Sequence, residues 1–397
     1  MKKLLTIVCL AISFNAVAQL PNTLVMNASR LQELKQQHQQ QPLKIVTDLC
    51  KEADSLLNMK PLSVMEKEFT PVSGNKHDYM SQAPYFWYDS TKPNGLPYMR
   101  KDGVRNPEIY KITDRTFLGR LDNATKILSL AWFLTGEEKY AQKSALLLRT
   151  WFISEATRMN PHLEYGQAIP GINTGRGIGI IETVALITIA DAASLLAGSN
   201  AWTTNDHQSL KKWYADYLNW LLISKYGMDE HKAKNNHGTW YYAQAIDFAL
   251  FTDNKEKAKE LIEESKTRLD SQLTKEGKQP LELDRTNGLG YSTMNLRGWF
   301  TVATLAKKAG YDLWNYKTTQ GAGLYTALDW LMPYAMGEKK WEYQQISKYN
   351  KSDLYTLLLQ AGVGFKEQKY FSVAKELEKE NKTFMSDILY VKKEAGK

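Results

Sequence analysis

The sequence predicts an all-α protein, a single (α/α) barrel or toroid of helical hairpins with long irregular loops lining a cleft. Apolar residues recur at helical spacing over most of the chain, whereas almost no stretch alternates with the period of two that marks strands. The helical stretches come in pairs joined by short turns, which favours hairpins packed side by side. No fixed repeat length is visible, so a tetratricopeptide-type array has less support.

The expected helices cover most of the chain after its N-terminus. Asn27 or Ser29 caps the first, and Gly136 joins a hairpin in the first half of the chain. The expected helices span residues 31–39, 42–57, 120–135, 138–150, 179–196, 205–224, 239–251, 255–273, 296–309, 324–336 and 352–362.

The N-terminus has the pattern of a secretory signal. Lys2 and Lys3 precede a short apolar run, and small residues ending at Ala18 form a cleavage site. We expect residues 1–18 to be removed and the protein to be periplasmic or secreted. Residues 19–397 are expected to form one toroid domain, because no linker, low-complexity run or charge boundary divides them. No later stretch has the length and hydropathy expected of a membrane helix, so no membrane partner is expected.

The composition is moderately basic and rich in aromatic residues. The chain has 51 Lys and Arg against 43 Asp and Glu, a formal charge of +8. This excess is spread out without a basic block, so nucleic acid is not an expected partner. It suits a cleft that attracts a polyanion, or else ordinary surface lysines. The 11 Trp and 22 Tyr exceed what a core requires, and many lie beside polar residues. The oligomeric state is not indicated.

The segment from residue 61 to 107 is irregular and rich in proline, glycine, asparagine and aromatic residues. A loop of this length within a domain is usually functional or disordered. Its aromatic residues argue against disorder, so we expect an ordered wall or lid of a cleft. Tyr79, Tyr85 and Trp87 are its candidate substrate-binding residues.

A cluster of polar and aromatic residues precedes an apolar helical run. Asn236 and His237 are followed closely by Trp240 and Tyr241, and hydrogen-bonding groups beside aromatic plates suit a carbohydrate site. Alternatively, the histidine is structural and the asparagines and Thr239 are helix caps. No H-E-x-x-H or Cys/His spacing occurs, so neither a metal site nor a cofactor is expected.

A second cluster contains Arg285 and Tyr291, separated by two glycines and therefore expected on a loop. Arginine presents a planar fork that suits a carboxylate. A tyrosine beside a cation can act as an acid or a base. Alternatively, Arg285 pairs with Asp284 or Glu282, and Tyr291 packs in the core.

A third stretch, residues 165–179, is glycine-rich and leads into a helix. No strand precedes it and the G-x-G-x-x-G spacing is missing, so a nucleotide fold is not supported. Asn173 and Arg176 could hold an anion at the helix N-terminus. Alternatively, Arg176 pairs with Glu182.

Together these residue types suit β-elimination in a uronic acid polysaccharide. The C5 proton of a uronate is too weakly acidic to leave unless its carboxylate is neutralised. Asn236, Arg285 and His237 could neutralise it, and Tyr291 could take the C5 proton and return one to O4. No metal or organic cofactor is required.

At this point the motifs resemble a known family. Asn235-Asn236-His237-Gly238-Thr239-Trp240, followed by Pro280-Leu281-Glu282-Leu283-x-Arg285 and Tyr291, resembles the alginate lyase family of (α/α) toroid polysaccharide lyases. The upstream motifs His77-Asp78-Tyr79, Ala83-Pro84-Tyr85-x-Trp87, Asn94-Gly95-Leu96-Pro97-Tyr98 and Asn106-Pro107-Glu108 are similar to that family too. The resemblance covers roughly Asp78 to Trp341.

The resemblance implies an enzyme acting on an anionic polysaccharide, with alginate as its expected substrate. It implies that Asn236 and Arg285 neutralise the carboxylate, that His237 neutralises it or acts as a base, and that Tyr291 is the acid/base. Asn173 competes with Asn236 for the neutralising role. The residues expected to contact substrate are Asn173, Arg176, Trp240, Tyr241, Tyr79, Tyr85 and Trp87.

Other activities stay open. A glucuronan or glycosaminoglycan lyase would share the mechanism. A glycoside hydrolase would need two opposed carboxylates, for which Glu282 with Asp284, or Glu164, are candidates without forming a clear pair. A glycan-binding protein without catalysis could use the same aromatic groove.

Overall fold

Helices make up nearly all of the regular structure. The computed structural model of the protein describes residues 20–381 and 384–390, so the predicted signal, residues 1–18, lies outside the described residues. The α-helices are α1 (Ala28–Gln40), α2 (Lys44–Leu56), α3 (Asp114–Thr135), α4 (Glu138–Leu148), α5 (Ala185–Leu195), α6 (Thr204–Ile223), α7 (Lys225–Lys232), α8 (Asn236–Phe251), α9 (Lys255–Gln272), α10 (Pro280–Leu283), α11 (Gly288–Lys308), α12 (Leu324–Met336), α13 (Lys351–Phe365), α14 (Gln368–Asn381) and α15 (Phe384–Leu389).

The remaining elements are short. They are the 3₁₀-helices η1 (Val64–Glu66), η2 (Pro107–Lys111) and η4 (Gly177–Val184), the π-helix η3 (Arg149–Ile153), and the strands β1 (Met80–Gln82), β2 (Phe86–Trp87), β3 (Met99–Arg100) and β4 (Tyr165–Ala168). β1 pairs in parallel with β4, and β2 pairs antiparallel with β3.

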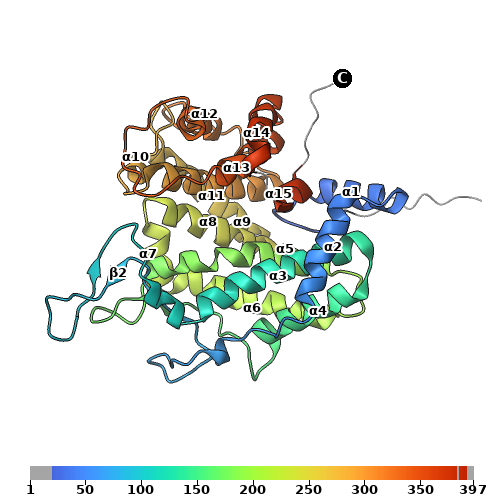
Figure 1. Ribbon diagram of the computed structural model, residues 1–397, viewed down its shortest axis with the longest axis horizontal. Coiled ribbons are helices and arrows are strands. Elements are labelled where there is room, and N and C mark those ends of the chain that lie inside the picture. The colour runs from blue at the N-terminus through green and yellow to red at the C-terminus, as the bar shows by residue number, and fades with distance from the viewer. Residues whose placement is uncertain (1–19, 382–383, 391–397) are drawn as a thin grey trace, which may run out of the picture.

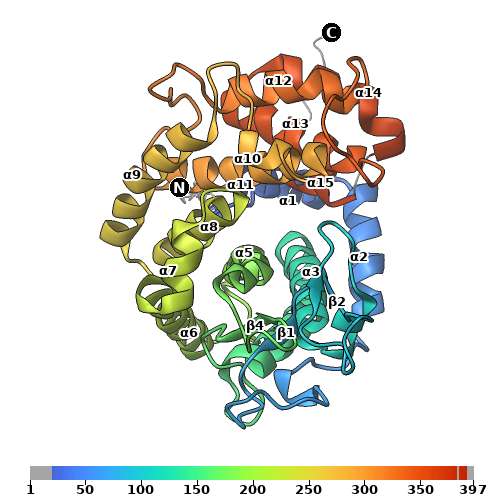
Figure 2. The same cartoon turned by 90° about the vertical axis from the view of Figure 1, so that its left-hand side faces the viewer.

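The long helices form two layers. α3, α5, α8, α11 and α13 contact one another in chain order and make the inner layer, and α4, α6, α9, α12 and α14 pack on its outside. Figure 2 shows α5 near the centre, surrounded by α3, α8 and the outer helices. Each hairpin buries its apolar face against the next, so one continuous hydrophobic core fills the molecule. The prediction of an all-α toroid is confirmed.

Several helices begin earlier than periodicity predicts. The side chain of Asn27 caps α1 as expected, accepting from the Arg30 N–H at 3.1 Å. α8 begins at Asn236, and α11 begins at Gly288, so the prediction that Tyr291 lies on a loop is wrong. Glycine disfavours a helix, but a tertiary contact holds this turn: the Gly288 N–H donates to the Gln344 carbonyl at 2.9 Å. Tertiary context therefore overrides local propensity at the start of α11.

The segment from Gly177 to Leu195 corrects another prediction. By length and composition it is apolar enough to cross a membrane, contrary to the sequence-based expectation. It forms η4 and α5, and most of it is buried within the toroid. Its apolar character is explained by its central position, where most of its surface packs against other helices and the remainder, including Val184 and Ile187, lines a cavity.

The irregular segment from residue 61 to 107 is ordered, as predicted. At its base, Lys67 and Asp114 form an ion pair at 2.9 Å with both side chains fully buried. The same carboxylate accepts from the Met80 N–H at 2.9 Å. Figure 1 shows β2 and its loop projecting from the end of the toroid where α7 and α10 lie. The segment therefore forms a wall at the end where α8 and α11 begin.

Candidate active site

Arg285 and Tyr291 form a close pair at the start of α11. The Nη2 of Arg285 donates to the Tyr291 hydroxyl at 2.7 Å, and the guanidinium carbon lies 3.8 Å from the centre of the tyrosine ring. Tyr291 in turn donates to the hydroxyl of Tyr85, 3.2 Å away on the irregular segment. Residues that are far apart in sequence thus place a cation, an acid/base candidate and a second phenol in contact.

The carboxylate partner of Arg285 is Asp102, not Asp284 or Glu282. Asp102 accepts from Nε at 3.2 Å and from Nη2 at 2.9 Å, which is a bidentate ion pair. Burial raises the pKa of Asp102, but the hydrogen bonds and charge of Arg285 outweigh burial and lower that pKa to about 2. Asp102 is therefore ionised at neutral pH.

The Tyr291 hydroxyl keeps its proton in the free protein. Burial is the main cause that raises its pKa, and the hydrogen bond to Tyr85 raises it further, while Arg285 acts in the opposite direction. A protonated phenol is ready to donate to a leaving oxygen. The Arg285 N–H directed at the phenol oxygen would stabilise the phenolate if the proton were lost.

Asn236 is buried below this site. Its backbone N–H and its Nδ2 donate to the two carboxyl oxygens of Glu282, at 2.6 and 2.7 Å, and its exposed fraction is 0%. Both donor groups of Asn236 are thus engaged by Glu282, and its contact with a uronate carboxylate stays a prediction. Asn236 ties α8 to α10, while burial raises the pKa of Glu282.

His237 lies in the first turn of α8 and is partly exposed. Its Nδ1 shares a 2.8 Å hydrogen bond with Glu230, whose side chain is fully buried. A carboxyl oxygen that accepts from Nδ1–H leaves Nε2 as the second, proton-free nitrogen of a neutral imidazole. Glu230 thus orients the ring so that Nε2 can act as an acceptor.

In the third stretch, residues 165–179, Arg176 does not form the ion pair with Glu182 that was the alternative prediction. Arg176 donates to Gln167 at 2.8 Å and lies 5.1 Å from the Phe86 ring. Burial lowers the pKa of Arg176 to about 10, and neighbouring Arg100 adds to that effect. Asn173 uses its Oδ1 to accept from Ile169 N–H at 3.1 Å, which closes a local turn.

The three stretches meet at one end of the toroid. Glu282 joins the first two, since it binds Asn236 and lies within electrostatic range of His237 and Arg285. The third stretch packs on α7, where Gly177 approaches the backbone of Glu230 so closely that a Cβ at Gly177 would lie 3.2 Å from the Glu230 nitrogen. α7 therefore links the glycine-rich stretch to His237.

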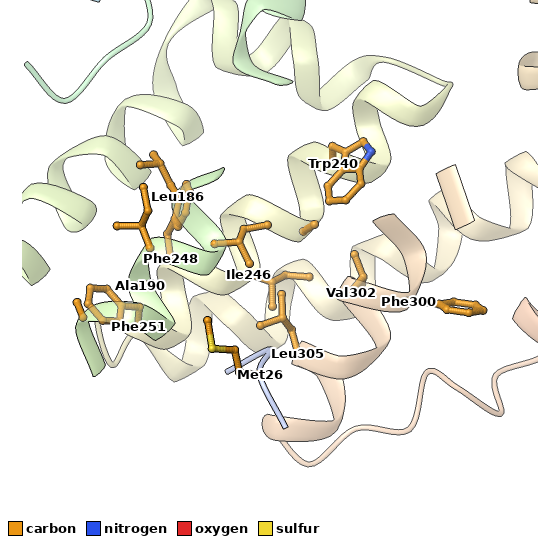
Figure 3. Packing of buried hydrophobic residues seen from close by; sticks show 14 of the residues in the cluster. Met26, Leu186, Ala190, Trp240, Ile246, Phe248, Phe251, Phe300, Val302 and Leu305 are labelled. Atoms are coloured by element: carbon orange, nitrogen blue, oxygen red, sulfur yellow. The ribbon is translucent and has the colours of Figure 1, made fainter. Parts of the chain in front are cut away.

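Three predicted substrate contacts belong to the core instead. Tyr79 is fully buried and donates to Glu182 at 2.9 Å, and Tyr241 is 1% exposed. Trp240 is 5% exposed and packs against Gly298 of α11, where an added Cβ would lie 3.2 Å from its ring; Figure 3 shows it among the buried hydrophobic residues. Tyr79 and Tyr241 therefore present no free face to a sugar, whereas Trp240 also lines a cavity together with Arg297 and Lys126.

Tyr85 and Trp87 remain accessible on the irregular segment. The Trp87 indole donates to the Val104 carbonyl at 2.9 Å, and the Lys101 ammonium lies 5.2 Å from its ring. An aromatic plate with an adjacent cation suits an acidic sugar.

Sequence reasoning did not identify Asp102 or Glu230 and considered Glu282 only as an ion-pair partner or hydrolase acid. Asp102 is 183 residues from Arg285, so no local spacing indicates their pairing. Glu230 is the exception: a carboxyl seven residues before a candidate histidine could have been noted. Within residues 20–381 and 384–390, no three His, Cys, Asp or Glu side chains are grouped as a metal site.

Comparison with known proteins places the chain in a family. The sequence profile of the family described as Alginate lyase matches residues 63–341. A crystal structure of an alginate lyase from Bacteroides ovatus is similar, with 37% sequence identity and a TM-score of 0.89, over 94% of this chain and 100% of that chain. A comparison with the curated proteins gave no match.

More distant structures share the fold. Alginate lyase A1-III from Sphingomonas species A1 has 15% identity and a TM-score of 0.54, over 86% of this chain and 94% of that chain. A tyrosine-to-phenylalanine variant of A1-III complexed with a tetrasaccharide has 15% identity and a TM-score of 0.60, over 92% and 95% of the two chains. The fold and the family profile together define a polysaccharide lyase with a helical toroid. The chain belongs to the alginate lyase family.

Proposed function

We propose that the protein cleaves a 1,4-linked uronate polymer, alginate in the first place, by β-elimination without a metal ion. The contact that carries the proposal is the 2.7 Å hydrogen bond from Arg285 to the Tyr291 hydroxyl, which pairs a carboxylate-binding cation with a proton donor. The similar enzyme from Bacteroides ovatus is described as an alginate lyase, which supports the same substrate class here.

In the proposed reaction Arg285 neutralises the uronate carboxylate, and the carbanion character that develops at C5 is delocalised into it. The C5–H bond breaks, a C4–C5 double bond forms, and the C4–O4 bond breaks with its electron pair leaving on O4. Tyr291 donates the proton that O4 requires. The proton removed from C5 goes to a protein base, so atoms and charge balance.

The identity of the base depends on the sugar. In guluronate the C5 proton and O4 lie on opposite sides, which suits His237 Nε2 as base and Tyr291 as acid. In mannuronate they lie on the same side. There Tyr291 first releases its proton to solvent and is stabilised as a phenolate by Arg285. The phenolate takes the C5 proton and passes that proton to O4, which regenerates the phenolate.

The test is the ultraviolet absorbance of the conjugated C4–C5 double bond. Purified protein is incubated with polymannuronate, polyguluronate, glucuronan and hyaluronan, each with EDTA. We expect absorbance to rise on an alginate block. A rise only on glucuronan or hyaluronan would replace alginate by that polymer. A flat trace on all four, with binding retained, would contradict the lyase proposal and favour a glycan-binding protein.

We also propose that the protein works after export, since its first 18 residues have a signal pattern. N-terminal sequencing of protein recovered from the periplasm or medium of an expressing bacterium tests this. An N-terminus at Gln19 would support export, and an uncleaved cytoplasmic chain would contradict it.

A further inference from the structure

Asp102 occupies a ready-made carboxylate receptor. Its oxygens accept from Arg285 Nε and Nη2 at 3.2 and 2.9 Å, from Arg100 Nη2 at 2.7 Å and from the Thr286 hydroxyl at 3.0 Å. Two guanidinium groups and a hydroxyl around one carboxylate are a strong anion site. The receptor holds a carboxylate that belongs to the chain itself.

The receptor lies next to the reacting group. Arg285 Nη2 binds Asp102 and also donates to the Tyr291 hydroxyl, so both share one nitrogen. In a uronate the carboxylate is attached to C5, the carbon that loses its proton. A sugar whose C5 and O4 approach Tyr291 therefore directs its carboxylate to the position that Asp102 holds.

One segment brings both Asp102 and Tyr85 to the site. The Lys101 N–H donates to the Tyr85 carbonyl at 2.8 Å, beside the β2–β3 pair. Gly103 has φ of +73°, and a Cβ there would lie 2.6 Å from the Thr286 hydroxyl, so only glycine allows this close approach. Moving the segment removes Asp102 from Arg285 and Tyr85 from Tyr291 together.

We propose that Asp102 is an internal substitute for the substrate carboxylate, which a uronate displaces to take over Arg285 and Thr286, while Arg100 stays paired with Asp102 on the same segment. Exchanging one carboxylate for another leaves neither guanidinium unpaired, so the empty site avoids an uncompensated cluster of cations. The exchange also releases Tyr291 from Tyr85. After cleavage, the return of Asp102 expels the carboxylate of the product. This inference rests on the proposed function, since it takes the ligand to be a uronate.

The proposal is tested by whether removing the Asp102 carboxylate tightens or weakens the binding of an oligosaccharide. In a Tyr291→Phe background, which prevents turnover, the dissociation constant of a mannuronate tetrasaccharide is measured by calorimetry with Asp102 intact, with Asp102→Asn and with Asp102→Glu. If the internal carboxylate occupies the receptor about 90% of the time, Asp102→Asn should tighten binding about tenfold. Asp102→Glu retains a carboxylate and should stay near the parent value.

The matched control is Asp89→Asn, which removes a carboxylate of the same segment that bonds to Thr91 within its own turn. It should leave the dissociation constant unchanged. Unchanged or weaker binding with Asp102→Asn, in a protein whose circular dichroism shows it folded, would overturn the proposal and make Asp102 a support for Arg285.

Different results would contradict the proposal for Asp102 and the proposal that the protein is a lyase. An active wild-type lyase whose Asp102→Asn variant does not bind more tightly would lose only the internal carboxylate. A wild-type chain inert on every uronate polymer, but with tighter binding after Asp102→Asn, would keep the internal carboxylate and lose the reaction.

Discussion

Two regions at one end of the toroid contain the predicted catalytic residues, and these residues differ in burial and in their contacts. At the start of α11, Arg285 and Tyr291 form hydrogen bonds with Asp102 and Tyr85 of the irregular segment and with each other. At the start of α8, Asn236 is fully buried. Within the first turn of α8, residues 236–239, His237 is the partly exposed residue. We propose that the turn before α11 and the first turn of α11 provide the reacting groups, and that α8 mostly provides the framework that supports them.

The largest effect is expected from a substitution in the first turn of α11. Tyr291→Phe removes the proposed proton donor and should lower kcat about 1,000-fold, because general acid–base groups contribute on that order. Tetrasaccharide binding, measured by calorimetry, should persist. Tyr85→Phe is the control, since the Tyr85 hydroxyl accepts from Tyr291 and is not the proposed proton donor, and kcat should fall no more than about tenfold. Equal activity of Tyr291→Phe and wild type would remove Tyr291 from the mechanism.

A smaller effect is expected at His237, the partly exposed residue in the first turn of α8. Glu230→Gln keeps the shape of the buried side chain but weakens its hold on His237 Nδ1, and kcat on polyguluronate should fall about tenfold to a hundredfold. The pH dependence of kcat should shift as well, which a purely structural defect would not cause. His231→Gln serves as control, because His231 bonds to Tyr242 at 2.9 Å within the α7–α8 packing. An unchanged pH profile for Glu230→Gln would assign His237 to the framework.

Two tryptophans allow a matched comparison between the accessible irregular segment, which carries Trp87, and the buried part of α8, which carries Trp240. Trp240→Leu should lower the free energy of unfolding by about 3 kcal/mol through lost packing, at the lower end of large aromatic truncations. Trp87→Leu should leave stability nearly unchanged and raise KM about tenfold, because a stacking surface for a sugar is lost. Chemical denaturation and steady-state kinetics on both variants test this. A raised KM with Trp240→Leu and none with Trp87→Leu would reverse the assignment.

The fold was accessible to sequence reasoning because helical periodicity is a local property. The hairpin of α3 and α4 has its turn at Gly136, as expected, with a left-handed φ of +77°. Where periodicity failed, tertiary contacts are found: α3 begins at Asp114, whose carboxylate binds Lys67 and the Met80 N–H. Such contacts join residues that no local window contains.

The candidate site was predictable only in part. Arg285 and Tyr291 were found through residue chemistry, and the structure brings them into contact. Trp240 and Tyr241 were assigned to a sugar site, whereas they pack on an inner helix, because a sequence shows that a ring is aromatic but not which side of a layer it faces. Asp102 could not be found, since its role exists only through the folding of the irregular segment onto α11.

The smallest predicted effect is the loss, at acid pH, of the stability that the Asp102–Arg285 ion pair contributes. Asp102 has a pKa of about 2 in the folded protein, against about 3.9 for an unfolded aspartate. A carboxyl whose folded pKa is depressed stabilises the fold above the unfolded value and loses that contribution as pH falls through the folded one. The difference in free energy of unfolding between wild type and Asp102→Asn should therefore be constant from about pH 5 to 7 and shrink between about pH 4 and 2. Urea titrations at matched ionic strength measure that difference, with Asp89→Asn as the comparison variant. A difference that stays constant down to about pH 3 would show that the Asp102–Arg285 ion pair contributes no net stability, and Asp102 would then be held in the receptor by the packing of its segment rather than by charge.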